Sequence, residues 1–450
     1  MNKKIDLTQG EIFSKLVKVS TPIMATSFMQ MAYNLTDMFW LGRLSSGAVA
    51  ASGTAGMFLW LSFALIFIGR MGAEIGVSQS IGRKEYDTAR KYAQNSLNVA
   101  GVLGLSYCLF LIFFRVPLVG FFRIPDLQVV QYTQDYLSFS ALAMPFIFLN
   151  QTMTGAFIAT GNTKLPFLLN SAGLVVNIIL SPILIFTFNL GVLGAAIGTI
   201  IAFVFAFCLF VIAMLKSKNR PFESFKFFSK PEKIYVRQIF KWGAPVGLES
   251  GFFTFLSMVV AMFIAEHGVG AIAVQRVGTQ IESLTWLLAG AFATAVTAFI
   301  GQNLGAKKYS RIHAGFKLAM VAMVLWGAVV TVILLVFPAQ LIGIFLTCPD
   351  EIALGVTYLR IFAVMQISAC TEMGAAGVFR GRGLTHIPSI VTTGGNVLRT
   401  VLAVVLMQFL GLYGIWIGVV IGSIIRAICM ILWCMHSIKQ VPKIDGVEYG

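Results

Sequence analysis

The sequence predicts an all-α polytopic membrane protein whose twelve transmembrane helices form two parallel six-helix repeats. Composition gives the class: 58% of the 450 residues are hydrophobic, 11% are charged and the mean hydropathy is +0.85, which is too apolar for a soluble domain. Apolar runs give the number of helices, because stretches of about 20 residues or more recur twelve times. A match of the chain with itself, at a shift of about 223 residues, gives the two repeats.

Each helix is predicted from an apolar run that ends at charged residues or at Gly and Pro. The first run begins near Phe13 and has no small-residue cleavage site after it, so we expect a retained helix and not a signal peptide. Several runs exceed the length that crosses a bilayer, so their ends should protrude or tilt. In chain order the predicted spans are 13–41, 48–80, 92–120, 132–158, 165–188, 192–215, 238–265, 271–301, 314–345, 353–379, 387–410 and 413–437.

The internal repeat predicts the domain organisation. The matching motifs are Lys18-x-x-x-Pro22 with Lys241-x-x-x-Pro245, Gln79-x-x-Gly82-x-Lys84 with Gln302-x-x-Gly305-x-Lys307, and Gly161-x-Thr163-x-x-Pro166 with Gly383-x-Thr385-x-x-Pro388. Each half holds an even number of spans, so both halves enter the membrane from the same side, as in many transporters. We expect an N-terminal lobe over residues 1–215, a basic linker over 216–237 and a C-terminal lobe over 238–450.

The basic residues predict the orientation in the membrane. The formal net charge is +15, but the lysines and arginines fall mostly between apolar runs, which favours loops beside anionic lipid over a nucleic-acid surface. Four of them, Arg83, Lys84, Arg90 and Lys91, lie between spans 2 and 3. The connection after span 9 carries acids and no base. By the positive-inside rule, the even-numbered connections and both termini are cytoplasmic and the protein lies in the cell membrane.

One intramembrane acid stands out as a candidate for ion coupling. Asp37 lies in the first span with no lysine or arginine between Lys18 and Arg43, and the polar residues Thr26, Gln30 and Asn34 share its helical face. A charge near the bilayer centre costs on the order of 2.5 to 3.5 kcal/mol, so such an acid needs a reason to be there. The alternative is an aspartate that only packs against a neighbouring helix through hydrogen bonds.

Three acids of the second half are weaker candidates. Glu249, Glu282 and Glu372 lie in spans 7, 8 and 10, and each stands where the first half has a neutral residue. We expect each to be either a second coupling acid or the partner of Arg276, Arg399 or a backbone group. In the first half, the i,i+4 spacing of Arg70 and Glu74 predicts a mutual ion pair.

A polar cluster in spans 5 and 6 complements Asp37. Asn177 and Ser181 share a helical face, Pro182 leaves a carbonyl of the preceding turn without its usual donor, and Thr199 lies on the next span. Together with Asp37 and Asn34 these groups offer oxygen atoms to a sodium ion, which is the only metal ion that we expect here.

Other chemistries find no support in the sequence. The six cysteines are scattered, the four histidines lie at or near span ends, and no G-x-S-x-G, P-loop or H-E-x-x-H motif occurs. No filter-like repeated loop predicts a channel. We therefore expect no catalytic residues and no cofactor.

The chain resembles the multidrug and toxic compound extrusion (MATE) transporters, especially their DinF-like branch. The resemblance rests on Pro22 with Gln30, Asn34 and Asp37, on the Gly161-x-Thr163-x-x-Pro166 motif, on the stretch from Asn177 to Pro182, and on the second-half copies. It implies two lobes in a V that open alternately to each side, and it places Asp37 in a cation site with Asn177, Ser181 and Thr199. Many relatives carry an aspartate where this chain has Ser181, which weakens a mechanism that needs two carboxylates.

These observations and the resemblance together predict a functionally monomeric antiporter that exports organic cations or amphiphilic drugs from the cytoplasm. The exchanged ion would be a proton bound by Asp37, with sodium as the alternative. Burial and the neighbours Gln30, Asn34 and Asn177 would set the affinity of Asp37 for protons. A flippase for a lipid-linked precursor is the leading alternative, although the first-half spans offer only Arg70, away from their ends, to an anionic lipid. A membrane-embedded enzyme is the next alternative.

Overall fold

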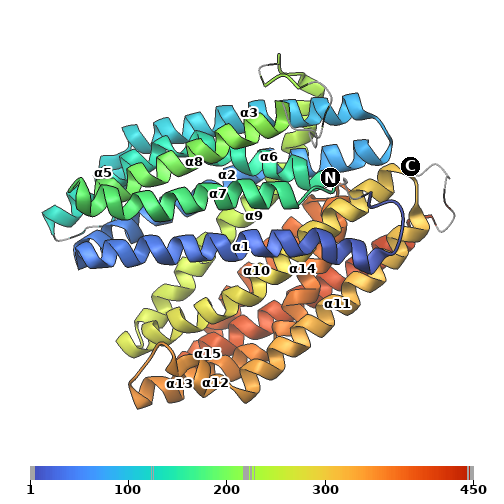
Figure 1. The fold of residues 1–450 in the computed structure, drawn as a ribbon. Helices are drawn as coiled ribbons and strands as arrows, with labels where there is room; N and C mark the ends of the chain where they lie inside the picture. The colour runs from blue at the N-terminus through green and yellow to red at the C-terminus, as the bar shows by residue number, and fades with distance from the viewer. Residues whose placement is uncertain are drawn as a thin grey trace. The chain divides into compact units, whose positions relative to one another are not determined.

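The computed structural model describes residues 6–122, 124, 126–215, 222, 225–227, 229–442 and 445, except for the side chains of residues 34, 35, 46 and 269. The chain forms two compact units (Figure 1). The first comprises Met1–Asp6 and Lys18–Gly247, and the second comprises Leu7–Val17 and Leu248–Gly450. Two helices therefore contribute residues to both units.

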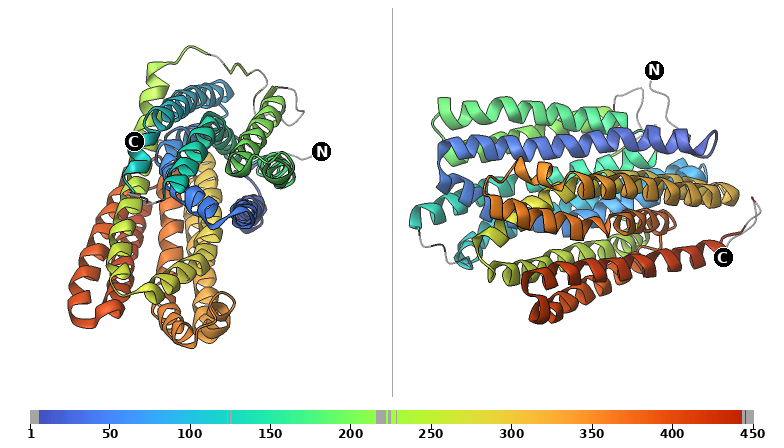
Figure 2. Two further views of the ribbon diagram at one scale, coloured as in Figure 1. Left: turned by 90° about the vertical axis from the view of Figure 1, so that its left-hand side faces the viewer. Right: turned by 90° about the horizontal axis from the view of Figure 1, so that it is seen from below.

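The first unit is a bundle of helices that run side by side (Figure 2). α2 packs against α3, α5 and α6, and α7 packs against α8. Buried apolar side chains of α2, α3, α5 and α6 form much of its core. The elements are α1 (Ile12–Leu44), α2 (Ser46–Gly82), α3 (Tyr86–Phe113), α4 (Arg115–Gly120), α5 (Leu127–Leu142), α6 (Met144–Ala159), α7 (Lys164–Pro182), the π-helix η1 (Ile183–Thr187) and α8 (Gly191–Leu215).

The second unit repeats this arrangement. α14 packs against α10, α11 and α15, just as α6 packs against α2, α3 and α8. The elements are α9 (Lys233–Ala265), α10 (Val269–Gly305), α11 (Tyr309–Val336), α12 (Pro338–Gly343), α13 (Pro349–Ala363), α14 (Gln366–Gly381) and α15 (His386–Lys439).

Helix α15 is a hairpin of two spans and not one 54-residue rod. Gly411 has φ +57° and ψ −135°, a conformation that reverses the chain and favours glycine. A Cβ atom on Gly418 would lie 2.5 Å from the backbone nitrogen of Ala403, so the two arms touch through their backbones. Gly414 and Gly422 lie one turn to either side of Gly418 and make the same kind of contact. A stripe of glycines thus lets the arms pack closely, as in many membrane helix pairs.

The described chain contains the predicted number of spans. Eight helices are long and apolar enough to cross a membrane, and two bent pairs, α5 with α6 (46°) and α13 with α14 (47°), raise the number to ten. Division of α15 at Gly411 and addition of the 33-residue α1 give twelve. The predicted fold class is confirmed, and each predicted span corresponds to one of these helices or pairs.

The two units also repeat one another in backbone detail. Lys84, after α2, and Lys307, after α10, are non-glycine residues with φ values of +63° and +53° at matching positions. A Cβ atom on Gly155 of α6 would lie 3.1 Å from a carbonyl oxygen of α2, and one on Gly377 of α14 would lie 2.6 Å from a carbonyl oxygen of α10. The two halves therefore share turn geometry and helix contacts.

Segments from both chain ends dock on one turn of the second unit. The buried Leu7 donates its N–H to Gln302 Oε1 (3.2 Å), near the end of α10. Ser310, at the start of α11, donates its N–H and its hydroxyl to the two carboxylate oxygens of Asp445 (2.8 Å each). Both segments therefore lie on the same side of this unit as the α10–α11 turn.

Candidate functional site

A pocket lies between α1, α7 and α8 of the first unit. It encloses about 520 Å³ free of protein atoms, its open mouth included. Its lining carries no charged side chain among the described residues and combines apolar groups with neutral amides and hydroxyls. The lining residues are Thr26, Met29, Gln30, Tyr33, Asn170, Ser171, Gly173, Leu174, Asn177, Ala202, Phe203 and Ala206.

The carboxylate of Asp37 lies one helical turn from this lining. Asp37 follows the lining residue Tyr33 by four positions on α1, so the two side chains share a face. Asp37 is only 8% exposed. The fully buried Ser181 of α7 donates its hydroxyl to Asp37 Oδ1 at 3.5 Å, a long hydrogen bond. The structure thus places Asp37 beside one of the partners that the sequence predicted.

A second group of polar side chains joins the same three helices. The hydroxyl oxygens of Tyr33 and Thr199 are 2.7 Å apart. Because Thr199 donates its own proton to the carbonyl of Ala195 (3.0 Å), Tyr33 is the donor in this pair. Asn177 also donates to Thr199 Oγ1, at 3.4 Å. Its Oδ1 is buried and has no hydrogen-bond partner in the described part of the chain.

The donor atoms of this site suit a proton or a hard monovalent cation. Asp37 is its single carboxylate, and the remaining groups are hydroxyls and the unpartnered amide oxygen of Asn177. Among the described residues, no group of three or more His, Cys, Asp or Glu side chains could hold a metal ion. Oxygen ligands of this kind are typical for hard cations and not for transition metals.

Gln30 and Asn34 are the two other predicted site residues of α1. Gln30 lines the pocket and is exposed. The side chain of Asn34 lies outside the described residues, so its predicted role stays a prediction. Sequence reasoning missed Tyr33, whose i,i+4 spacing to Asp37 was the available signal. It also missed Ala202 and Ala206, because small residues on an apolar helix carry no signal of a cavity.

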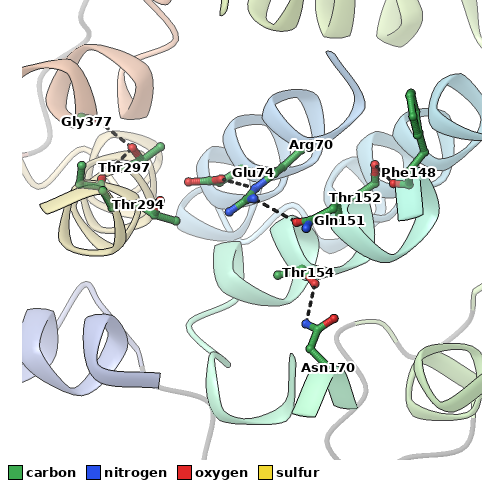
Figure 3. A network of polar contacts seen from close by, with 12 residues as sticks. Arg70, Glu74, Phe148, Gln151, Thr152, Thr154, Asn170, Thr294, Thr297 and Gly377 are labelled. Carbon is green, nitrogen blue, oxygen red and sulfur yellow. Dashed lines mark hydrogen bonds and ion pairs between the residues drawn. The ribbon is translucent and has the colours of Figure 1, made fainter. Parts of the chain in front are cut away.

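The polar lining of the pocket is supported by a neighbouring helix. Asn170 donates to Thr154 Oγ1 of α6 at 3.4 Å (Figure 3). On the same helix, Gln151 accepts a hydrogen bond from Arg70 Nη1 (3.0 Å). The predicted pair of Arg70 and Glu74 is present at 3.9 Å between Nε and Oε2, so this arginine bridges α2 and α6 (Figure 3).

Each candidate acid of the second unit contacts a polar side chain. The carboxylate of Glu372 lies 2.9 Å from Arg426 Nη2. Glu249 lies 3.6 Å from Arg380 Nη2 and accepts a hydrogen bond from a serine hydroxyl of α15. Glu282 accepts a hydrogen bond of 2.5 Å from the hydroxyl of Tyr358. Arg276 makes none of these contacts. Arg399, the other predicted partner, interacts with Glu282 and Glu372 through its charge without a direct ion pair to either.

A protein-family model agrees with the repeat and with the membrane architecture. The model described as MatE matches residues 22–183 and again residues 245–405, once in each half. The chain belongs to the MatE family. This confirms the family that the sequence resembled, whereas the DinF-like branch stays a prediction.

Known proteins resemble this MatE chain over nearly its whole length. The probable multidrug resistance protein NorM of Thermotoga maritima is 25% identical over 435 residues, which cover 95% of this chain and 93% of that protein. The multidrug export protein MepA of Staphylococcus haemolyticus is 25% identical over 442 residues, 97% of this chain and 96% of that one. A solved outward-facing structure of a multidrug resistance MATE family transporter has the same fold, with a TM-score of 0.91. The two chains are 22% identical, and the match covers 99% of this chain and 100% of that one.

Proposed function

We propose that this MatE chain is a secondary antiporter that exports organic cations and amphiphilic drugs from the cytoplasm in exchange for protons. The observation that carries the proposal is the single buried carboxylate of Asp37, one turn from an uncharged pocket on the same three helices. The names of the relatives, which are multidrug resistance and export proteins, support the substrate class. We expect a functional monomer in the plasma membrane with both termini in the cytoplasm.

The lining of the pocket supports an amphiphilic substrate. Met29, Leu174 and Phe203 offer apolar contacts, whereas Gln30 and Asn170 offer amide groups. Such a surface binds varied shapes because methionine and aromatic side chains adapt to them. The charge of a cationic substrate would be balanced by Asp37, and a neutral lining gives no attraction to an anionic lipid head group. The flippase alternative is therefore the weaker one.

Asp37 can couple substrate movement to protons because its charge is costly where it lies. Removal from water disfavours an ionised carboxylate, and the hydrogen bond that Ser181 donates to Asp37 is long, at 3.5 Å. A proton or a cationic substrate can each neutralise Asp37, so the two compete. Competition of this kind is sufficient for exchange when each ligand favours a different access state.

Sodium is the alternative coupling ion. Asp37, Asn177, Ser181 and Thr199 offer oxygen atoms to it, and the amide oxygen of Asn177 has no other described partner. A proton needs only the carboxylate, whereas sodium needs several oxygens in a fixed arrangement, which is why we favour the proton.

The test uses proteoliposomes loaded with a fluorescent organic cation and given either a pH gradient or a sodium gradient alone. We expect the pH gradient to drive exchange and Asp37→Asn to abolish it, because the amide keeps the size but cannot titrate. The matched control is Asp87→Asn, which removes an 85% exposed carboxylate of the same unit and should leave exchange unchanged.

Three outcomes would contradict parts of the proposal. Wild-type exchange by Asp37→Asn would remove the role of Asp37. Exchange driven by a sodium gradient at clamped pH would show that sodium, and not the proton, is the coupling ion. If Glu249→Gln or Glu372→Gln then stopped this exchange while Asp37→Asn did not, the coupling site would lie in the second unit. Lipid translocation without drug exchange would favour the flippase.

A further inference from the structure

The second unit places an arginine at the position where the first unit has its pocket. In the first unit, a Cβ atom on Gly173 of α7 would lie 3.0 Å from the Cβ of Ala206 on α8. In the second unit, a Cβ atom on Gly395, in the first arm of α15, would lie 2.5 Å from the Cβ of Arg426, in the second arm. Gly173 and Gly395 are repeat counterparts, so Ala206 and Arg426 occupy equivalent places.

Other lining positions of the pocket also differ between the repeats. Short gaps change the shift that aligns the two halves from 223 to 222 and, after Gly191 and Gly411, to 220 residues. These shifts relate Thr26 to Glu249, Gln30 to Phe253, Leu174 to Asn396, Asn177 to Arg399 and Ala206 to Arg426. Four of these replacements introduce a charged or bulkier side chain, and the fifth, Leu174 to Asn396, introduces an amide. The guanidinium of Arg399 packs over the ring of Phe253 at 5.0 Å, so these replacements contact one another.

Arg426 is held from two sides by hydrogen bonds. Its Nε donates to Glu372 Oε2 at 3.0 Å and its Nη2 lies 2.9 Å from the same oxygen. Its Nη1 donates to Asn396 Oδ1 at 2.5 Å. Asn396 is fully buried, and the side chains of Glu372 and Arg426 are only 8% and 12% exposed. A carboxylate and an amide oxygen therefore converge on one planar cation.

We propose that Glu372 and Asn396 form a guanidinium-binding site, equivalent to the pocket of the first repeat, whose resident ligand is the chain's own Arg426. The site takes planar cations that donate hydrogen bonds in a fork, and it stays filled while Arg426 is present. It does not depend on what the protein transports, because the ligand is internal.

The chemistry favours arginine as this ligand for two reasons. A guanidinium presents its donors in a rigid fork, and hydrogen bonds between charged groups are about twice as strong as neutral ones. The carboxylate also needs a counter-charge, because removal of one partner of a buried ion pair leaves the other charge without a contact that compensates it. Loss of Arg426 should therefore leave a hollow that attracts a free cation of the same shape.

The test is chemical rescue of the variant Arg426→Ala, which introduces the residue that the first repeat has at this place. The purified variant should melt at a lower temperature than the wild type. Guanidinium chloride in the low millimolar range should raise its melting temperature saturably, whereas equal concentrations of sodium chloride should not. The wild type should not respond, because Arg426 already occupies the site.

Two matched variants define the specificity of the rescue. Glu372→Gln added to Arg426→Ala should abolish the response, because the carboxylate that binds guanidinium is gone. Arg382→Ala removes another buried arginine of the second unit, which donates to the hydroxyl of Ser437 at 2.7 Å. It should show no saturable rescue.

The proposal stays testable if Arg426→Ala does not fold. Arg426→Ser leaves the same space with a polar group in it and should show the same rescue. A double-mutant cycle of Glu372→Gln and Arg426→Gln should in addition show strong coupling of the two side chains in melting temperature. The same response of wild type and variants to guanidinium, or no coupling in the cycle, would overturn the proposal.

Discussion

Ala206 controls the space in the pocket of the first unit, because its methyl group leaves room that a longer side chain would fill. We predict that Ala206→Met weakens substrate binding about tenfold, which is ~1.4 kcal/mol, without loss of the fold. Binding of a fluorescent organic cation to purified protein measures this. The control is Ile212→Met, at a 53% exposed position on the same helix, which should bind normally. Equal binding by all three proteins would show that substrates do not use this pocket.

Asp445 ties the C-terminal segment to the start of α11 in a pH-dependent way. The N–H and hydroxyl of Ser310 hold the pKa of Asp445 below its usual range, and desolvation opposes this only in part. A lowered pKa in the folded state means that the contact contributes its full stability above the unfolded value near 3.9, and loses it as pH falls through the lower folded value.

We therefore predict that the Ser310 amide is protected from hydrogen exchange at neutral pH and loses this protection below about pH 4, after correction for the intrinsic exchange rate. Asp445→Asn should show low protection at every pH. Protection in the wild type that does not change between pH 6 and pH 3 would contradict the assignment.

The sequence predicted the pair of Arg70 and Glu74, which lie one turn apart on one helix, but not the pairs that join distant helices around Glu372 and Tyr33. Glu372 and Arg426 are 54 residues apart, and nothing in the spacing favours Arg426 over the other arginines of that half. The pair depends on how the two arms of α15 and helix α14 pack. Tyr33 was missed for a related reason: its hydroxyl matters only because Thr199, 166 residues away, lies within 2.7 Å.

Among the helices, the glycine stripe of α15 makes the sharpest prediction. Gly418→Ala should destabilise the protein by about 1 to 3 kcal/mol, because its Cβ would lie 2.5 Å from backbone atoms that cannot rotate away. Gly394→Ala is the control, since no atom lies within 4 Å of its Cβ. It should be neutral or stabilise by up to ~1 kcal/mol, the helix preference of alanine over glycine. Thermal melting in detergent compares them, and equal effects would show that the arms do not pack through this stripe.

Helix positions were predictable because an apolar run of about 20 residues has few other stable structures in a membrane. Details within a span were not. The predicted span 132–158 is two helices, α5 and α6, bent by 46°, and Pro145 lies in the first turn of α6, where proline often begins a helix. The predicted spans 92–120 and 314–345 each end in a short separate helix, α4 or α12. Prolines begin α6 and α12, and hydropathy, from which the spans were predicted, does not record such breaks.

For the whole molecule, the main open prediction is its orientation. We predict that a single cysteine at Lys307, in the α10–α11 turn, is labelled only from the cytoplasm, and one at Asp350, at the start of α13, only from outside. Both positions are exposed, and the exposed native cysteines 208, 348 and 429 must first be replaced. Lys218, in the predicted basic linker, is also predicted to be cytoplasmic, but it lies outside the described residues. The opposite labelling pattern would invert the topology and with it the direction of transport.

The difference between Ala206 and Arg426 bears on why the two repeats share one chain. An assembly of two identical subunits carries every substitution twice, so it would have an alanine at both places or an arginine at both. With alanine at both places, the carboxylate equivalent to Glu372 would have no arginine partner in either subunit. With arginine at both places, neither subunit would have room for the pocket. Covalent fusion of the repeats removes that constraint, and each half can then change without the other.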